Sequence, residues 1–215
     1  MKKNLMLSGI FAALFLLLIV LVRTVDVAPV GPAGTEIGLS HINQSFAELT
    51  GVNKAWYAVT EGFGFTAILV VFIFAGVGLF QLIRRGSLAK VDRQILAAGV
   101  LYVVVLALYV LFEFVIVNYR PVLMGTETFP EASFPSSHTM LICTVMGSAI
   151  LLLPRYEKKR GPLLALRYAC GLVIIVTVLG RLISGVHWFS DIVGGVLISL
   201  ALLFAFAAAL GKPGE

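Results

Sequence analysis

Six long apolar runs leave this chain little choice of environment. Five of them come close to the roughly 20 residues that a helix needs to cross the hydrocarbon core of a bilayer. The fourth is shorter, and we expect it to include the turn that begins near Ser136. The predicted spans are residues 5–22, 62–83, 95–117, 139–153, 163–183 and 189–210. They predict an all-α integral membrane protein, a bundle of six transmembrane helices in a single membrane domain over residues 1–215.

The composition excludes two classes of function. About 60% of the residues are apolar and 13% are charged, against about 45–50% and about 25% in soluble domains. A soluble enzyme and a nucleic-acid-binding protein are therefore excluded. Cys143 and Cys170 both lie in apolar runs without a Cys-x-x-Cys spacing. We therefore expect no disulfide framework, zinc site or thiol redox motif.

The positive charges predict how the bundle is oriented. Of the 16 Lys and Arg residues, 11 lie in the two chain ends and in the loops 84–94 and 154–162. Only three lie in the segments 23–61, 118–137 and 184–188. Positive residues gather in cytoplasmic loops. We therefore expect a multi-pass protein of the cell membrane, with both termini in the cytoplasm and the segments 23–61, 118–137 and 184–188 on the outer side.

The first span and the segment after it have their own signals. The apolar run after Lys2 and Lys3 is longer than that of a typical signal peptide, and no small-residue cleavage site precedes Arg23. We therefore expect an uncleaved first helix. Residues 24–50 are rich in Gly, Pro, Ala and Thr. They predict an outer loop, with a short surface helix near residues 41–49.

Polar and ionisable residues at membrane depth are costly, so they mark candidate functional sites. In this chain they fall at the ends of four different spans. The topology places these span ends at the same outer edge of the bilayer, so we expect one site there. Its candidate residues are Arg120, Ser136, Ser137, His138, Arg181, His187 and Asp191.

These residue types favour phosphate chemistry. The two arginines offer planar N–H donors that suit phosphate oxygens, and Ser136 and Ser137 at a helix start favour an anion. His187 and Asp191 are four residues apart, so on a helix they would share one face. The carboxylate could then orient a nucleophilic imidazole, while His138 supplies a proton to the leaving oxygen. The arginines would repel a divalent cation, so we expect no metal and no cofactor.

Three motifs in this order resemble a known signature, that of the type 2 phosphatidic acid phosphatase superfamily, a group that includes many integral membrane lipid phosphatases. The resemblance implies the six-helix fold and a phosphatidic-acid-phosphatase-like catalytic core over residues 61–210. The motifs are Arg120-Pro121, Pro-Ser-Ser-His at 135–138, and Arg181 followed after five residues by His187 and after three more by Asp191.

The resemblance also implies a role for each residue. His187 would attack phosphorus and form a phosphohistidine, with Asp191 orienting it. His138 would protonate the leaving oxygen and then activate water, without a metal. The phosphate oxygens would be held by Arg120, Arg181, Ser136 and Ser137.

The chain departs from the family pattern at three positions. Ser137 stands in place of a glycine and adds a hydroxyl. Gly180 replaces the serine before Arg181, which removes one hydrogen bond to phosphate. Glu113, seven residues before Arg120, stands where the family has a lysine, so a cation that would touch phosphate has become an acidic residue.

Glu113 therefore has several possible roles. It can line the site, pair with Arg120 or Arg181, or accept a proton from the substrate side. Lys54 or Arg23 of the outer loop can replace the lost charge.

Glu61 also has two possible roles. The preferred interpretation is that it caps the N-terminus of the second membrane helix, where a carboxylate is favourable. The alternative is that it lines the site.

The leading hypothesis is a metal-independent phosphatase that hydrolyses a lipid phosphate or pyrophosphate at the outer face. Undecaprenyl pyrophosphate is the first candidate and phosphatidylglycerophosphate the next, with phosphatidate and diacylglycerol pyrophosphate open. A lipid phosphotransferase would have the same sequence pattern. A non-catalytic lipid-binding or transport protein on this scaffold is favoured by Glu113 but opposed by the presence of His138, His187 and Asp191. The partner is a membrane lipid, and the sequence indicates no oligomeric state.

Overall fold

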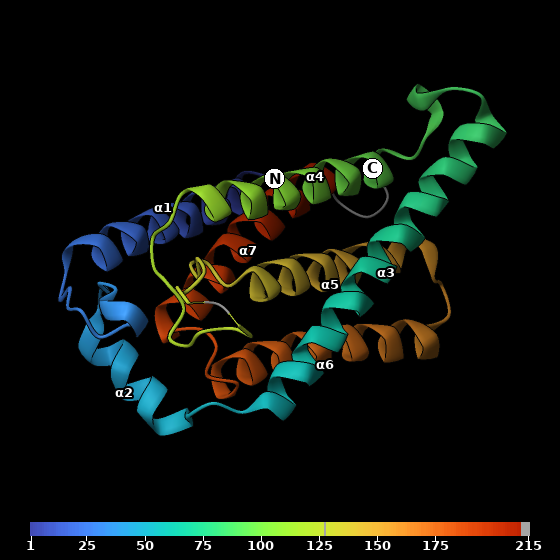
Figure 1. The fold of residues 1–215 in the computed structure, drawn as a ribbon. Helices are drawn as coiled ribbons and strands as arrows, with labels where there is room; N and C mark the ends of the chain where they lie inside the picture. The colour runs from blue at the N-terminus through green and yellow to red at the C-terminus, as the bar shows by residue number, and fades with distance from the viewer. Residues whose placement is uncertain (127, 212–215) are drawn as a thin grey trace.

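The structure is a computed structural model that describes residues 1–126 and 128–211 (Figure 1). Six long helices form its bundle. All six are long and apolar enough to cross a membrane, and within the described residues the only β-structure is two isolated bridges. The predicted all-α six-helix fold is thus confirmed. The long helices are α1 (Lys2–Thr24), α3 (Lys54–Arg85), α4 (Arg93–Phe114), α5 (Ser137–Tyr156), α6 (Arg160–Ile183) and α7 (Phe189–Leu210).

The observed helices differ from most of the predicted spans at one or both ends, and the largest difference is at the start of α3. The sixth span agrees with α7, but α3 begins eight residues before the predicted 62–83. The third span was expected to end at residue 117, whereas α4 ends at Phe114. The difference arises because Val117 is buried in the loop, in the same core cluster as Phe134. Its apolar character serves loop packing and not the membrane span.

The central helix is α5. It contacts α3, α4, α6 and α7, and 11 of its 20 residues are buried. The outer helices instead expose apolar side chains, such as Phe65, Phe72 and Phe80 of α3. Such exposed side chains suit a lipid environment, in which the helices satisfy their own backbone hydrogen bonds.

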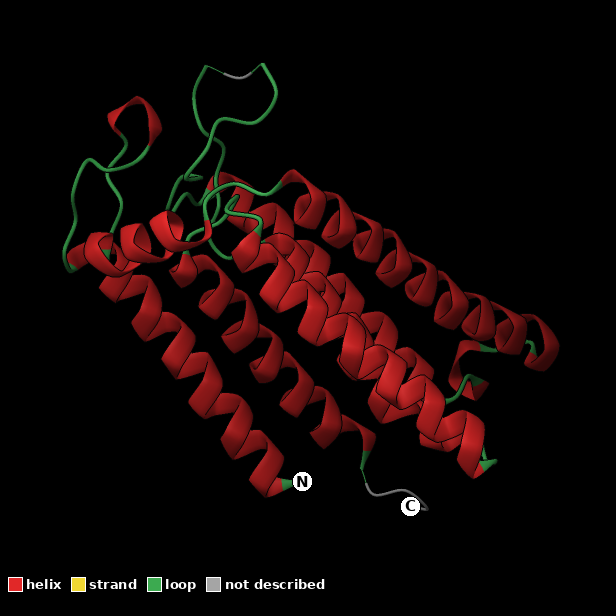
Figure 2. Cartoon of the chain, turned by 90° about the horizontal axis from the view of Figure 1, so that it is seen from below, coloured by secondary structure: helices red, strands yellow, loops and turns green. Residues whose placement is uncertain are grey.

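The two ends of the bundle differ in structure, as Figure 2 shows. The long loops gather at one end, and the N-terminus of α1 lies at the other. The loop end also holds the short helix α2 (Ser40–Thr50), which corresponds to the surface helix predicted near residues 41–49. We call the loop-bearing end the outer end.

Helix α2 is docked on the first turn of α7. The fully buried Asn43 donates from Nδ2 to the Gly38 carbonyl at 2.8 Å and to Ser190 Oγ at 3.0 Å. Its Oδ1 accepts from the Ser190 amide at 3.0 Å. Beside it, the rings of Phe46 and Phe189 stack with centroids 4.2 Å apart. The outer segment therefore holds the start of α7 in place.

At the opposite end, Asp92 joins three helices. Its carboxylate accepts hydrogen bonds from Arg85 Nη1 at 2.7 Å, Gln81 Nε2 at 2.8 Å and Tyr156 Oη at 3.3 Å. These residues belong to α3 and α5, and Asp92 directly precedes α4. The cluster ties the turn between α3 and α4 to the central helix.

Candidate active site

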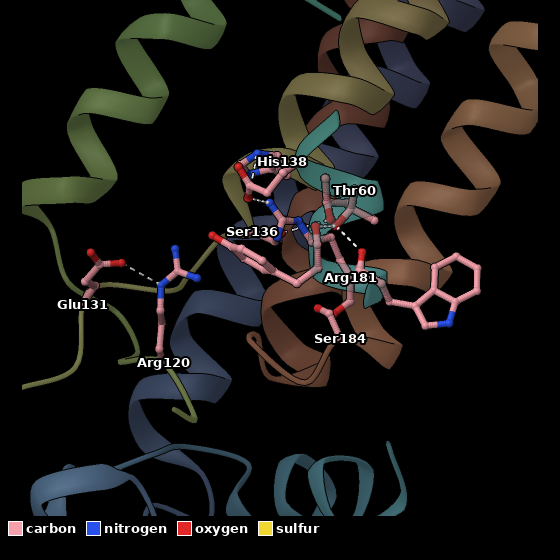
Figure 3. A network of polar contacts seen from close by, with 11 residues as sticks. Thr60, Arg120, Glu131, Ser136, His138, Arg181 and Ser184 are labelled. Carbon is pink, nitrogen blue, oxygen red and sulfur yellow. Dashed lines mark hydrogen bonds and ion pairs between the residues drawn. The ribbon is translucent and has the colours of Figure 1, made fainter. Parts of the chain in front are cut away.

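The candidate residues do converge at the outer end, although they come from five segments of the chain. Arg120 lies in the loop between α4 and α5, and Ser136 is the residue before α5. Arg181 lies in the last turn of α6, and His187 lies in the turn that leads to α7. Figure 3 shows Arg120, Ser136, His138 and Arg181 around one region.

Arg120 is positioned by the loop that carries it. Tyr119 forms an isolated antiparallel bridge with Ala132, and the Arg120 amide donates to the Glu131 carbonyl at 2.9 Å. The indole Nε1 of Trp188 donates to the Tyr119 carbonyl at 2.6 Å and so ties this loop to the start of α7. The guanidinium pairs with Glu131, with 3.0 Å between Nε and Oε2 (Figure 3). The buried Nη1 has no hydrogen-bond partner among the described residues.

The start of α5 lies against α7. The Ser136 amide donates to the Asp191 carbonyl at 3.0 Å, and Ser136 Oγ accepts from Thr139 Oγ1 at 3.0 Å. A Cβ at Gly195 would lie 2.8 Å from Cβ of Thr139, so the glycine permits this close approach. Ser137 and His138 follow in the first turn, where backbone N–H groups favour an anion.

Arg181 is a buried cation, and two of its nitrogen donors have no hydrogen-bond partner among the described residues. Its side chain is only 1% exposed, and Nη2 lies 2.6 Å from Oε1 of Glu61. The guanidinium carbon lies 5.2 Å from the ring centroid of Tyr57. Nε and Nη1 are buried without a hydrogen-bond partner among the described residues. A buried charge needs counter-charge and hydrogen bonds, so these two donors are suited to an anion.

The glycine at position 180 has a local cause. A Cβ there would lie 2.7 Å from Cγ2 of Thr60 and 3.0 Å from Cε3 of Trp56. Helix α3 packs so closely on α6 that a serine side chain does not fit without rearrangement.

Glu61 is part of the site, and its preferred interpretation as a helix cap is wrong. Helix α3 begins at Lys54 and is capped by Asn53, whose Oδ1 accepts from the amides of Ala55 and Trp56 at 3.1 and 3.2 Å. Glu61 lies two turns further on. The polar and aromatic residues before the apolar run are helical too, which places the carboxylate at the depth of Arg181.

His138 contacts the same carboxylate as Arg181. Its Nε2 lies 3.2 Å from Glu61 Oε1, the oxygen that also pairs with Arg181. The His138 side chain remains 25% exposed. One oxygen of Glu61 therefore bridges the two residues.

His187 and Asp191 lie near each other, but not as two residues on one helix face. His187 lies in the turn before α7, and its Nδ1 is 3.7 Å from Oδ2 of Asp191. That oxygen accepts from the Trp188 amide at 2.9 Å and so caps α7. The helix-face prediction is therefore wrong, because α7 starts only at Phe189, although the turn still brings the two side chains close together.

The environment of His187 keeps its imidazole neutral. The ring is buried, and neither ring nitrogen has a hydrogen-bond partner among the described residues. Burial, aided by the charges of Arg120 and Arg181, lowers the pKa of His187 well below its usual value. A neutral imidazole is the form that can act as a nucleophile.

Glu113 lines a small cavity of about 20 Å³ together with Arg120, Ser133, Ser137 and His187. Among the ion pairs of the described residues, Glu113 pairs with neither arginine, because Arg120 pairs with Glu131 and Arg181 with Glu61. It therefore adds an acidic group beside the predicted nucleophile.

An apolar cleft adjoins this cavity. Its volume is about 590 Å³, and it lies between α3, α4 and α5. Ser137 and His138 line it, and it shares Tyr109 and Met140 with the small cavity. The polar site is thus joined to a space lined by apolar side chains.

The arrangement suits an anionic group that carries an apolar chain. Two guanidinium groups and the start of α5 offer N–H donors beside a neutral imidazole. The part of the chain that the structure describes contains no group of three or more His, Cys, Asp and Glu residues placed to hold a metal ion.

Sequence reasoning missed part of this site. The sequence predicts Glu131 as a solvated loop residue and Tyr57 as part of an interfacial aromatic belt, and it gives Asn43 no role. Glu61 carried a usable signal, because an ionisable residue close to a predicted span is a functional candidate by default. Glu131 and Tyr57 gave no comparable signal.

Comparisons with known proteins identify the family and a similar fold. The model of the PAP2 superfamily matches residues 96–214. Among solved structures, the chain is similar to the crystal structure of the first transmembrane PAP2 type phosphatidylglycerolphosphate phosphatase from Bacillus subtilis. The TM-score is 0.65 and the identity 17%, over 97% of this chain and 99% of that one. No curated protein matches the sequence. The family model covers more than half of the chain, so this chain belongs to the PAP2 superfamily.

Proposed function

We propose that the protein hydrolyses a lipid phosphate or pyrophosphate at the outer face of the cell membrane through a phosphohistidine formed on His187. The observation that carries this proposal is the position of His187. Its neutral ring lies beside Arg120 and Arg181, at a polar site that joins an apolar cleft.

The chemistry would proceed in two steps. Because Nδ1 of His187 faces Asp191, Nε2 is the nitrogen that attacks phosphorus. The bond from phosphorus to the leaving oxygen breaks, and His138 gives that oxygen a proton. In the second step water attacks phosphorus, His138 accepts a proton from the water, and the bond to Nε2 breaks with release of inorganic phosphate. Arg120 and Arg181 would stabilise the charge on the phosphoryl oxygens.

The substrate would lie with its apolar chain in the cleft and its phosphate beside Ser137. Undecaprenyl pyrophosphate is the first candidate, because such a carrier is recycled on the outer face of bacterial membranes. Phosphatidylglycerophosphate is the second, and the similar structure from Bacillus subtilis is named for that activity. The distribution of positive loops supports the outer orientation of the site, with both termini in the cytoplasm.

The test is phosphate release by the detergent-purified protein in the presence of EDTA. Undecaprenyl pyrophosphate, phosphatidylglycerophosphate and phosphatidate are offered in parallel to the wild type, to His187→Ala and to His41→Ala. His41 is an exposed histidine on α2, so its variant is the matched control. We expect release by the wild type and by His41→Ala, and none by His187→Ala.

Other outcomes identify the alternatives. Release that EDTA abolishes would contradict the metal-independent mechanism. Consumption of the lipid without release of inorganic phosphate would indicate a phosphotransferase. Binding of the lipid without any turnover would indicate a lipid-binding protein. Glu113 favours this hypothesis because its negative charge opposes the charge of the arginines.

A further inference from the structure

Glu61 is a carboxylate in the site to which the proposed mechanism assigns no task. Glu61 Oε1 lies 2.6 Å from Nη2 of Arg181 and 3.2 Å from Nε2 of His138. It comes from α3, whereas His138 comes from α5 and Arg181 from α6. One carboxylate oxygen thus links three helices at the point where the proton donor and a phosphate ligand meet.

The contact with His138 depends on the shape of α3. Gly64 follows Glu61 by three residues and so lies on the same face of the helix. A Cβ at Gly64 would lie 3.1 Å from Nε2 and 3.2 Å from Cδ2 of His138. The Nε2 edge of the imidazole therefore lies against α3, held by Glu61 and accommodated by a glycine.

This geometry decides which nitrogen of His138 is available. An ionised carboxylate only accepts hydrogen bonds, so the 3.2 Å approach of Nε2 to Glu61 favours a hydrogen on that nitrogen. The pairing of Glu61 with Arg181 supports the ionised form. The other nitrogen, Nδ1, is then the one that can exchange a proton with the substrate.

We propose that Glu61 is a positioning residue that fixes the tautomer of His138, so that proton transfer in this site occurs at Nδ1. The proposal rests on the proposed phosphatase function. The charged imidazole gives its Nδ1 proton to the leaving oxygen as the bond to phosphorus breaks. It keeps its Nε2 hydrogen on Glu61 and later takes a proton from water at Nδ1. Carboxylates that orient histidines are a common device in catalytic sites.

The first experiment reads the tautomer in the resting protein. The chain has three histidines, so ¹⁵N-histidine labelling gives a simple spectrum, and His41→Ala and His187→Ala assign it. At alkaline pH, where free imidazole is neutral, we expect His138 to carry its proton on Nε2. We expect Glu61→Ala to remove this preference. A resting His138 protonated on Nδ1 would overturn the proposal whether or not the protein is a phosphatase.

The second experiment separates proton donation from phosphate binding. A nitrophenyl phosphate has a good leaving group that needs little protonation, whereas a lipid phosphate has a poor one. We expect Glu61→Gln to lower kcat/KM about 10- to 100-fold for the lipid and much less for the nitrophenyl ester. Glu61→Asp, which keeps the charge, should recover part of the loss.

A glycine pair on α3 provides the matched control. Gly64→Ala places a methyl group against the His138 ring, whereas a Cβ at Gly62 meets nothing within 4 Å. We expect Gly64→Ala to follow the pattern of Glu61→Gln and Gly62→Ala to behave as the wild type.

Two results would contradict the role assigned to Glu61. Equal losses on both substrates in Glu61→Gln would mean that Glu61 acts on phosphate binding through Arg181. Wild-type kinetics of Glu61→Gln on the lipid would mean that it has no role in turnover. If the wild type is inactive or His187→Ala remains active, the proposed function fails, and the tautomer measurement still judges the placement of His138.

Discussion

Each cation of the site has a carboxylate beside it. Arg181 pairs with Glu61 and Arg120 with Glu131, while Glu113 lies in the same small cavity as Arg120. The resting site therefore carries less positive charge than its two arginines suggest. A phosphate that binds here must compete with these carboxylates or share the guanidinium groups with them.

Glu113→Lys tests this balance directly. The substitution restores the lysine of the family pattern and replaces a negative charge with a positive one beside Arg120. We expect inorganic phosphate to inhibit the variant at about tenfold lower concentration, a change of about 1.4 kcal/mol. Inhibition constants for phosphate measure the effect. Glu48→Lys on α2 is the control. Glu48 is exposed, and its substitution makes the same change of charge elsewhere at the outer end. Unchanged phosphate inhibition in Glu113→Lys would contradict this account.

The buried His187 makes stability depend on pH. Its pKa in the folded protein lies well below the usual 6.5, so below about pH 6.5 the unfolded chain binds a proton that the folded protein does not. Stability should therefore fall as the pH decreases below that value.

Thermal unfolding in detergent at about pH 8 and about pH 5.5 checks this expectation. The loss of Tm on acidification should be smaller in His187→Gln than in the wild type. The Tm of the exposed control His41→Gln should fall on acidification by as much as the Tm of the wild type. An equal loss in all three proteins would show that His187 does not cause it.

At the scale of the elements, the sequence predicted the six membrane helices but not all of their ends. Hydropathy marks the residues that face lipid, and the predicted span 189–210 has the same ends as α7. Hydropathy fails at the start of α3, where Lys54 and Glu61 lie in a helix that extends beyond the apolar run. It also fails at Val117, which is apolar because the loop packs it inward.

The motif residues of the site could be predicted from the sequence, but the residues that they contact could not. His138, Arg181 and His187 belong to recognisable motifs, but Glu61 and Glu131 meet them only through tertiary packing. No spacing in the sequence encodes a contact between residues 61 and 181. The position of His187 in a turn could not be predicted either. The spacing of four residues between His187 and Asp191 fits both a helix and a turn followed by a helix.

Asn43→Ala tests the attachment of α2 to α7. The substitution removes two hydrogen bonds to Ser190 and leaves its buried amide without this partner. We expect a loss of about 1–3 kcal/mol in stability. We also expect a lower kcat, because Ser190 adjoins Asp191. Melting temperature and phosphate release measure the two effects. The exposed neighbour Gln44 gives the control Gln44→Ala, and a similar loss in both variants would contradict a specific role for Asn43.

At the scale of the whole molecule, the two ends of the bundle carry different tasks. The outer end holds the titratable residues of the site, and the opposite end holds the cluster around Asp92. The central helix α5 connects the two, with His138 in its first turn and Tyr156 as its last residue.

Asp92→Ala should therefore separate stability from catalysis. The change removes the acceptor for Arg85, Gln81 and Tyr156, and we expect a lower Tm but unchanged kcat and KM while the protein remains folded. The hydrogen bond from Arg85 lowers the pKa of Asp92. Its contribution to stability is thus present above about pH 4 and lost as the pH falls further. The adjacent exposed residue gives the control Arg93→Ala. A changed KM in Asp92→Ala would show that the two ends are coupled.

The cleft beside Ser137 has a consequence for how the protein meets its substrate. Its walls include Phe72, Val103 and Leu106, which are 68%, 67% and 62% exposed on the lipid-facing side of the bundle. A lipid would enter sideways from the membrane plane and not from water. The quantity that sets the rate would then be the mole fraction of substrate in the surrounding layer. In mixed micelles, added inert detergent should slow turnover at constant bulk concentrations of lipid and protein, a case of surface dilution kinetics.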